Sequence, residues 1–324
     1  MRPCCRKWGV KKVVTDGVER PLARLSNFLQ DSSRWDEFTF RPDDIVISTP
    51  PKCGTTWVQM ITALLVFQTP ELPAPMSTLS LWLDARMAAK RQVFADLDKQ
   101  THRRFIKTHT ARWGLPIAKG VTYICVGRDP RDVALSWDDH MANVDRTVIG
   151  MKIFAAAAID GVDPPPLPDP PPEDVDQSAR AKFWRWVLDD TSPTSVSSSL
   201  LATVDHVQSF WAVRDADNTV LLHYDDLKAD LAGQMRYLAD RLGLDVPTRQ
   251  WPSLVKAASF EQMRSRPSMT APEAGLFTDD AAFFRKARKA AWREILDNEQ
   301  DLRGYNERAA ALAPAELLAW LHRS

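Results

Sequence analysis

The sequence predicts an α/β fold, with a single domain in which helices flank a central parallel sheet. Apolar runs rich in β-branched residues at 45–49, 123–127 and 219–223 are typical of buried parallel strands. A helical pattern follows each run, and strands that alternate with helices indicate a doubly wound sheet. Such sheets bind ligands at the carboxyl ends of their strands, so we expect the functional residues to follow these runs.

Composition and charge exclude several classes of partner. The chain of 324 residues has 42 basic and 42 acidic side chains, so no global positive field favours nucleic acid as a partner. No apolar run approaches the roughly 18 to 20 residues of a membrane span, and residues 1–9 lack the apolar core of a signal peptide. We therefore expect a soluble protein without an integral membrane segment.

The four cysteines indicate a reducing, cytoplasmic setting. Cys4 and Cys5 are adjacent, whereas Cys53 and Cys125 lie far apart, which gives neither a metal-binding pattern nor a disulfide framework. We therefore expect no metal site. Residues 1–25 are basic with little periodicity, and we expect them to form a loose N-terminal extension.

A candidate phosphate-binding loop, part of a P-loop-like strand-loop-helix unit, connects the first strand to its helix. Pro50 and Pro51 end the strand, and a helical pattern begins near Thr56. Backbone N–H groups and the positive end of the helix converge at such a loop, which favours a bound anion. A plain strand-to-helix turn is the alternative. The loop contains Lys52, Cys53, Gly54, Thr55 and Thr56.

The position of the lysine separates this loop from that of the nucleotide triphosphatases. Lys52 precedes Gly54, whereas the motif G-x-x-x-x-G-K-[ST] has its lysine after the glycine, beside a Mg-binding hydroxyl. An ordinary ATPase loop is therefore disfavoured. Trp57 follows the loop, and its flat apolar face suits either stacking on a base or simple packing.

Two segments after the first helix predict a second helix and a short strand. Residues 79–98 have the helical spacing of apolar side chains. Residues 104–109 read as a strand, in which a period of two places Lys107 and His109 on one face. This pair supplies a cation and a base together, and a histidine that only packs is the alternative.

The next strand ends at an arginine beside a well-signalled helix start. Asp129 suits the N-cap and Pro130 the first helical position, and Ser136 lies two turns into the helix. Arg128 is well placed there to hold a second phosphate. Pairing of Arg128 with Asp129 or Asp132 on the surface is the alternative.

The pattern degrades between 141 and 200, which we interpret as an insertion or lid over the acceptor site. Residues 162–176 contain too many prolines for a helix or a central strand and should be extended or mobile. The flanking aromatic residues are available either to line a pocket or to pack. They are Phe154, Phe183, Trp184 and Trp186.

The C-terminal part predicts an amphipathic helix and a basic patch. Leu231, Met235, Leu238 and Leu242 share one stripe, and Gly243 ends the helix. The basic patch suits either a solvated helix face or anion binding. Its members are Arg285, Lys286, Arg288, Lys289 and Arg293.

Together these motifs resemble the cytosolic-type sulfotransferases, and within them most closely the bacterial lipid and glycolipid sulfotransferases. PKCGTTW at 51–57 resembles the phosphosulfate loop of the family, and KTH at 107–109 its K-T-H element. RDPRDVALS at 128–136 resembles the 3'-phosphate element, and VLLHYDDLKAD at 220–230 the strand-turn-helix. ASFEQMR at 258–264 and FFRKARKAAWR at 283–293 resemble the T-S-F and final basic elements. The resemblance runs from about residue 34 to the end, apart from the 141–200 region.

The resemblance implies in-line transfer of a sulfuryl group from 3'-phosphoadenosine 5'-phosphosulfate (PAPS), without a metal, to a hydroxyl of an apolar or amphipathic acceptor. That acceptor would be a lipid, glycolipid, phenol or sterol. His109 would be the base, and Lys52 and Lys107 would meet the charge that grows on the bridging oxygen. The nucleotide would be held by Lys52, Cys53, Gly54, Thr55, Thr56, Trp57, Arg128, Ser136, Tyr224, Phe260, Arg285 and Lys286.

Several positions depart from the family pattern. Cys53 replaces a serine and removes a hydroxyl donor from the loop, so we expect weakened but not lost binding. Ala287 and Ala290 stand where the family has glycines, beside the expected 3'-phosphate clamp. Ala258 replaces a threonine near the adenine. Residues 293–302 lack the Thr-Val centre of the family's dimer motif, so the sequence leaves the oligomeric state open.

Two other functions are kept as alternatives. The altered positions also suit a PAPS- or nucleotide-binding protein without turnover. VLLHYDD resembles a strand that ends in a Mg-binding aspartate, Asp225 or Asp226, as in a P-loop kinase, although the position of Lys52 disfavours this reading.

Overall fold

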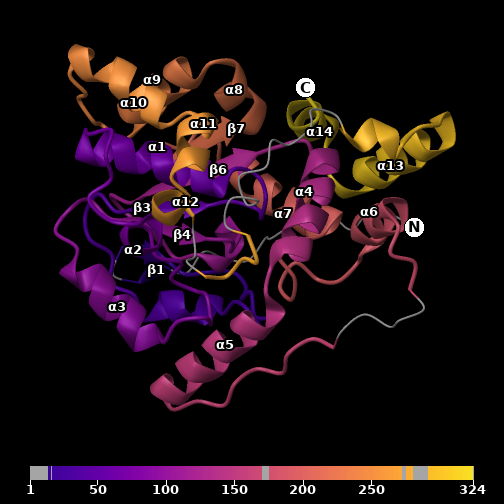
Figure 1. Cartoon of the computed structure of the whole chain (residues 1–324), viewed down its shortest axis with the longest axis horizontal. Coiled ribbons are helices and arrows are strands. Elements are labelled where there is room, and N and C mark those ends of the chain that lie inside the picture. The colour runs from indigo at the N-terminus through magenta and orange to yellow at the C-terminus, as the bar shows by residue number, and fades with distance from the viewer. Residues whose placement is uncertain (1–13, 16, 170–174, 272–274, 280–290, 324) are drawn as a thin grey trace.

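The computed structural model describes residues 14–15, 17–169, 175–271, 275–279 and 291–323. Its centre is a parallel sheet of four strands in the order β4-β3-β6-β7 (Figure 1). The strands are β3 (Ile45–Ser48), β4 (Phe105–Thr108), β6 (Thr122–Gly127) and β7 (Thr219–His223). The predicted strands and their parallel arrangement with flanking helices are confirmed.

Helices cover both faces of this sheet, because neighbouring residues of each strand pack into opposite layers. Ile45 and Ile47 of β3 belong to one hydrophobic core, whereas Val46 belongs to the other. The first layer is built by α1 (Thr55–Phe67), α9 (Leu231–Arg241) and α10 (Trp251–Ala257). The second is built by α4 (Pro130–Asn143), α6 (Ala179–Leu188), α7 (Leu200–Trp211), α13 (Glu299–Leu312) and α14 (Ala315–Leu321).

Shorter elements connect and extend these layers. The helices are α2 (Met76–Leu79), α3 (Lys90–Lys99), α5 (Arg146–Asp160), α8 (Tyr224–Ala229), α11 (Phe260–Ser265) and α12 (Pro267–Thr270). The 3₁₀ turns are η1 (Ser32–Asp36), η2 (Arg112–Gly114), η3 (Thr248–Gln250) and η5 (Ala291–Glu294). A small antiparallel sheet joins β1 (Val14–Thr15), β2 (Val18–Glu19) and β5 (Ile117–Ala118).

The predicted helix over residues 79–98 is wrong in its first half. Helix α3 begins only at Lys90, and residues 81–83 instead lie in parallel beside β4. The Lys107 N–H donates to the Leu81 carbonyl at 3.0 Å, and the Leu83 N–H donates to the Lys107 carbonyl at 3.3 Å. The outer edge of β4 offers unpaired backbone groups, and satisfying them outweighs the helical spacing. Trp82 is thereby placed next to Lys107.

The loose extension expected for residues 1–25 is wrong where the structure describes it. β2 pairs with β5, the Leu22 N–H donates to the Trp113 carbonyl at 2.7 Å, and Leu25 is buried. These apolar side chains carry no periodic signal in the sequence, but they cover Trp113 and Ala111. Residues 1–13 and 16 lie outside the described part.

In its described part, the segment 141–200 contains the helices α5 and α6. Helix α5 runs along the lower edge of the molecule in Figure 1, and residues 163–169 after it form neither helix nor strand. Of the aromatic residues predicted to line a pocket or pack, Phe183 and Trp186 are buried in the second core, whereas Phe154 is exposed. Within the described ranges, no helix combines the length and the apolar character needed to cross a bilayer.

A buried ion pair holds the amino ends of β3 and β4 together. The Arg104 Nε donates to Asp44 Oδ1 at 2.8 Å, and its Nη2 donates to Asp44 Oδ2 at 2.5 Å. Both side chains are almost completely buried, and the Arg104 guanidinium also donates to the Thr39 carbonyl. A pair in this position is costly to break, because the remaining charge would be left buried and unpaired.

We expect Arg104→Met to lower the free energy of unfolding by roughly 3 to 5 kcal/mol, because it leaves the Asp44 carboxylate buried without its cation. Urea unfolding followed by circular dichroism measures the change. Lys99→Met, which removes an exposed ion pair with Asp96, is the matched control and should cause only a small change. Equal effects of the two substitutions would contradict this role for Arg104.

Candidate functional site

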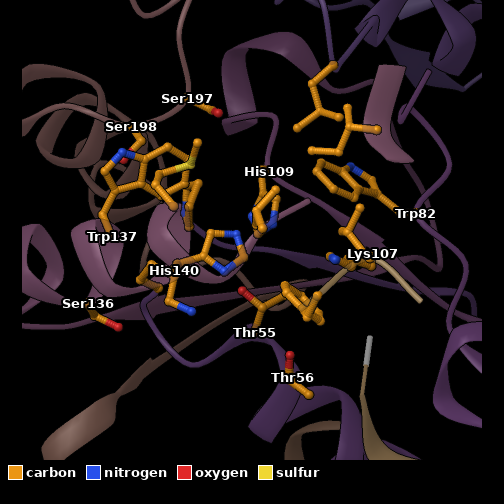
Figure 2. A pocket seen from close by; sticks show the side chains of 18 of the residues that line it. Thr55, Thr56, Trp82, Lys107, His109, Ser136, Trp137, His140, Ser197 and Ser198 are labelled. Carbon is orange, nitrogen blue, oxygen red and sulfur yellow. The ribbon is translucent and has the colours of Figure 1, made fainter. Parts of the chain in front are cut away.

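A cavity of about 740 Å³ opens at the carboxyl ends of β3, β4 and β6. Figure 2 shows Lys107, His109 and His140 gathered around the start of α1, where Thr55 and Thr56 lie. The size lies within the range of roughly 300 to 1,000 Å³ that is usual for small-molecule sites. One end of the cavity is lined by the predicted anion loop, and the other end is apolar.

The loop between β3 and α1 has the backbone of an anion site. Lys52 and Gly54 both have positive φ, 66° and 105°, a strained conformation for Lys52. Gly54 is the N-cap of α1, so the N–H groups of the first helical turn have no intrahelical acceptor and converge at this point. The hydroxyls of Thr49 and Thr55 are hydrogen-bonded to each other, which fixes the loop to the end of β3.

The structure brings Arg128 to the same loop. Its Nη1 donates to the Lys52 carbonyl at 2.8 Å, and its guanidinium carbon lies 4.4 Å from the centre of the Tyr224 ring. Arg128 is buried, yet its Nε has no hydrogen-bond partner within the part of the chain that the structure describes. A buried, unsatisfied guanidinium N–H is costly, and a ligand anion would satisfy it.

The helix start after Arg128 is as predicted. Asp129 caps α4 by accepting from the Arg131 N–H at 2.9 Å, and Pro130 is the first helical residue. The Asp129 carboxylate also forms an ion pair with the Arg131 side chain at 2.6 Å, so Asp129 pairs with Arg131 and not with Arg128. Ser136 lies further along α4 and lines the cavity.

Three aromatic side chains line the cavity beside the loop. The Trp57 Nε1 donates to the Ala258 carbonyl at 2.8 Å, and the Trp57 ring meets the Tyr224 ring edge to face at 5.5 Å. Phe260, which begins α11, is also part of the lining. These rings offer apolar faces on which a planar base could rest.

His109 is held in one tautomer. Its Nδ1 lies 2.8 Å from the Thr49 carbonyl oxygen, which only accepts, so Nδ1 carries the proton and Nε2 carries the lone pair. Burial, and secondly the Lys107 ammonium, hold the pKa of His109 well below its usual value. The imidazole is therefore neutral at physiological pH and presents a basic nitrogen.

A buried carboxylate, which the sequence reasoning missed, fixes the backbone around His109. Asp84 accepts from the Thr108 hydroxyl at 2.7 Å, from the Thr110 hydroxyl at 2.5 Å and from the Trp35 indole at 3.1 Å. Asp84 thus holds the residues on both sides of His109 in place by hydrogen bonds. Threonines on both sides of the histidine, Thr108 and Thr110, were a sequence signal for a shared hydrogen-bond acceptor. The acceptor, Asp84, could not be identified from the sequence because it lies 24 residues away from Thr108.

Two lysines complete the cationic end of the cavity. The Lys107 ammonium lies 4.3 Å from the centre of the Trp82 ring. Burial, followed by the charges of Arg128 and Lys107, lowers the pKa of Lys52 to about 7. The neighbouring cations therefore repel one another, and an anion bound between them would relieve that repulsion.

His140 and the apolar part of the cavity lining were not predicted in detail. His140 follows Ser136 by one helical turn, a spacing that puts both on one face of α4. Burial, together with the charges of Lys52 and Lys107, lowers the pKa of His140 to about 3, so a second neutral imidazole faces the site. The apolar lining includes Phe28, Leu29, Trp82, Met87, Trp137, Met141, Val144, Ile149, Leu167, Leu276 and Phe277.

Most of the predicted site residues meet in this one cavity. Its lining includes Lys52, Gly54, Thr55, Thr56, Trp57, Lys107, His109, Arg128, Ser136, Tyr224 and Phe260. The Cys53 side chain does not line it but is buried in the second core, where burial raises the pKa of the thiol to about 12. Arg285 and Lys286, together with Ala287 and Ala290, lie outside the described residues.

Comparisons with known proteins agree on one family. A sequence model of the sulfotransferase domain matches residues 42–304. A glycolipid sulfotransferase of Mycobacterium bovis is 38% identical over 309 residues, which cover 91% of this chain and 93% of that protein. A glycolipid sulfotransferase of Mycobacterium tuberculosis is 37% identical over 311 residues, with the same coverage of 91% and 93%.

Solved structures resemble this chain in fold. Mouse sulfotransferase SULT7A1 complexed with PAP has a TM-score of 0.62 at 20% identity, covering 89% of this chain and 90% of that one. Retinol dehydratase in a complex with retinol and PAP has a TM-score of 0.64 at 20% identity, covering 86% and 83%. At this identity the likeness concerns the fold, which agrees with the predicted α/β class.

We expect Gly54→Ala to weaken the binding of 3'-phosphoadenosine 5'-phosphate by at least about tenfold, a change of about 1.4 kcal/mol. A Cβ at Gly54 would lie 2.9 Å from Cδ2 of Tyr224, at a φ of 105° that favours glycine. Gly243→Ala is the matched control, since its φ of 63° causes similar strain but no atom lies within 4 Å. Calorimetric titration should separate the two, and equal affinities would contradict the role of the loop.

We expect the same nucleotide to take up protons when it binds at pH 8. Lys52, with a pKa of about 7, is mostly neutral at that pH in the free protein, and a bound phosphate raises its pKa. Affinity should therefore fall as the pH rises above about 7. Calorimetry in two buffers with different ionisation enthalpies measures the number of protons taken up. These protons can be assigned to the protein, because the phosphate, with a pKa of about 6, is already ionised at pH 8.

Lys52→Met should abolish this proton uptake, whereas Lys119→Met, which changes an exposed lysine outside the cavity, should preserve it. A binding enthalpy of the unmodified protein that is the same in both buffers would rule out the shifted pKa of Lys52.

Proposed function

The chain belongs to the sulfotransferase domain family, and from that premise we propose that it transfers the sulfuryl group of PAPS to a hydroxyl of a glycolipid-type, amphipathic acceptor. The observation that carries the proposal is the meeting of three features in one cavity: an anion loop, an unsatisfied arginine, and a neutral histidine. The names of the mycobacterial relatives support the class of acceptor.

The residues of the cavity fit a nucleotide with two separate anionic groups. The first turn of α1 and the hydroxyls of Thr55 and Thr56 would hold the 5'-phosphosulfate. Arg128, with its unsatisfied Nε, and Ser136 would hold the 3'-phosphate. Trp57 and Phe260 offer ring faces to the adenine. The buried thiol of Cys53 does not enter this contact, so only its backbone would take part.

When bound, the phosphosulfate would supply an activated sulfuryl group. His109 Nε2 would accept the proton of the acceptor hydroxyl, whose oxygen forms the new bond to sulfur as the bond between sulfur and the bridging oxygen breaks. Lys52 and Lys107 would face the negative charge left on the bridging oxygen. The Thr49 carbonyl keeps His109 in the tautomer that can accept the proton.

Burial serves this chemistry in two ways. It keeps His109 and His140 neutral, so that neither imidazole adds positive charge at the acceptor side. It also strengthens the attraction between the lysines and an anion, because the effective dielectric constant is lower than in water.

Two alternatives are weaker on the same observations. A P-loop kinase would need Asp225 or Asp226 beside the phosphates, but neither is among the residues that line the cavity, and Asp226 pairs with Arg323 at 2.5 Å. A binding protein without turnover would not need a neutral, oriented histidine at the site.

The test of the nucleotide is calorimetric titration with 3'-phosphoadenosine 5'-phosphate, with ADP and ATP plus Mg²⁺ as controls. Preference for the 3'-phosphorylated nucleotide is expected, because the unsatisfied Nε of Arg128 offers a donor to a second anion. Tighter binding of ATP would overturn the proposal.

We expect His109→Ala to reduce product formation by about 10² to 10⁴, the usual contribution of a general base, while nucleotide affinity stays within about twofold. The assay follows release of 3'-phosphoadenosine 5'-phosphate from PAPS with a panel of hydroxylated acceptors, glycolipids included. His102→Ala is the matched control, since His102 lies before the amino end of β4, away from His109 at the carboxyl end, and does not line the cavity. Undiminished turnover in His109→Ala would exclude the histidine as the base.

A further inference from the structure

We propose that helix α5 and the segment after it form a docking surface for a lipid bilayer, from which the acceptor enters the cavity. The proposed docking surface consists of Met151, Phe154, Ile159, Val162 and Leu167. It rests on the proposed function in one respect, the amphipathic nature of the acceptor.

Exposed apolar side chains are concentrated on this surface. Among the described residues, seven large hydrophobic side chains are exposed, and five of them lie between 151 and 167, with exposed fractions of 41% to 59%. The other two, Leu188 and Tyr237, lie singly elsewhere. An exposed apolar patch of this density indicates an interaction site, whereas scattered residues need no explanation.

The spacing puts the patch on one face of α5. At 3.6 residues per turn, Met151, Phe154 and Ile159 fall within an arc of roughly 140° on one side of the helix, and Val162 follows just beyond its end. The exposed residues Ala155 and Ala158 lie on the same face. No charged side chain interrupts it.

The opposite face of α5 is apolar as well. Ile149 and Ile153 are buried in a small core with Trp82 and Phe277, and Ile149 lines the cavity. The charged residues of α5 are Arg146 at its start, Lys152 near the border between the two faces and Asp160 at its end, so both the inner and the outer face are mainly apolar. Here one face closes the cavity, so lipid is the environment that suits the other face.

The docking surface is continuous with the mouth of the cavity. Leu167 is exposed and also lines the cavity, and so does Arg146, an exposed cation at the start of α5. A chain that leaves the bilayer at this surface would pass from one apolar lining to another. Arg146 would offer a cation to a phosphate or sugar headgroup at this surface.

Size favours a bilayer over a second copy of the chain. A stable protein interface buries about 800 Å² per partner and involves about 20 to 30 residues a side, far more than this single helix face offers. An interfacial helix needs only its apolar face buried about 5 to 10 Å into the headgroup boundary. Helix α5 and the segment after it form the lower edge of the molecule in Figure 1.

The first experiment is co-sedimentation of the full chain with vesicles. One set of vesicles is phosphatidylcholine alone, and the other contains about one phosphatidylglycerol in five lipids, which adds negative charge. The double variant Met151→Asp and Phe154→Asp should bind at least about tenfold more weakly than the unmodified protein. Leu188→Asp with Tyr237→Asp is the matched control, with two exposed apolar residues changed elsewhere, and should bind as the unmodified protein does.

The second experiment compares two forms of one acceptor. The Met151/Phe154 double variant should turn over a short-chain, water-soluble glycolipid at an unchanged rate, because neither residue lines the cavity. It should turn over a long-chain glycolipid in vesicles several-fold more slowly. Equal loss with both acceptors would overturn the proposal, since it would indicate damage to the site.

Two further outcomes would also overturn it: failure of the unmodified protein to sediment with either vesicle, or a dimer in solution that the double variant converts to a monomer. Vesicle binding that depends on Met151 and Phe154 in the absence of any sulfuryl transfer would uphold the docking surface and reject the proposed function.

Discussion

The pairing of β3 with two parallel neighbours is the constraint on which the rest of the structure depends. β3 hydrogen-bonds in parallel to β4 on one side and to β6 on the other, so the carboxyl ends of all three strands lie at the same end of the sheet. The anion loop, His109 and Arg128 follow directly after these strands. A shift of register by one residue would turn every strand side chain to the opposite layer, and the two hydrophobic cores prevent it.

The cavity gathers positive charge in a chain whose formal net charge is zero. Burial, and secondly the charges of Arg128 and Lys107, lowers the pKa of Lys52 to about 7, so holding these cations together without an anion is electrostatically unfavourable. An anionic ligand offsets this cost, so part of its affinity is prepared in advance by the fold. Burial, with a smaller contribution from the neighbouring lysines, lowers the pKa of His109 and of His140, so both imidazoles are neutral beside these cations.

Sequence reasoning predicted the fold class, the loop, the helix start at Asp129 and the family, because these depend on local patterns. It failed where tertiary contacts decide. Residues 81–83 hydrogen-bond to the outer edge of β4 and do not form a helix. Residues 18–25 pair with β5 and pack around Trp113. Asp84 was missed because its partners Thr108 and Thr110 lie far from it along the chain, and His140 because its place in the cavity lining depends on tertiary packing.

The hydrogen bond from His109 to the Thr49 carbonyl joins two parts of the site that are usually considered separately. Thr49 leads into the anion loop through Pro50 and Pro51, and its hydroxyl is bonded to Thr55 in α1. The backbone that shapes the anion site thus also aims the imidazole. On the proposed mechanism, binding and chemistry could not drift independently in evolution: a change in the loop that altered nucleotide capture would also displace His109, and the effects of paired substitutions at the two places would not add.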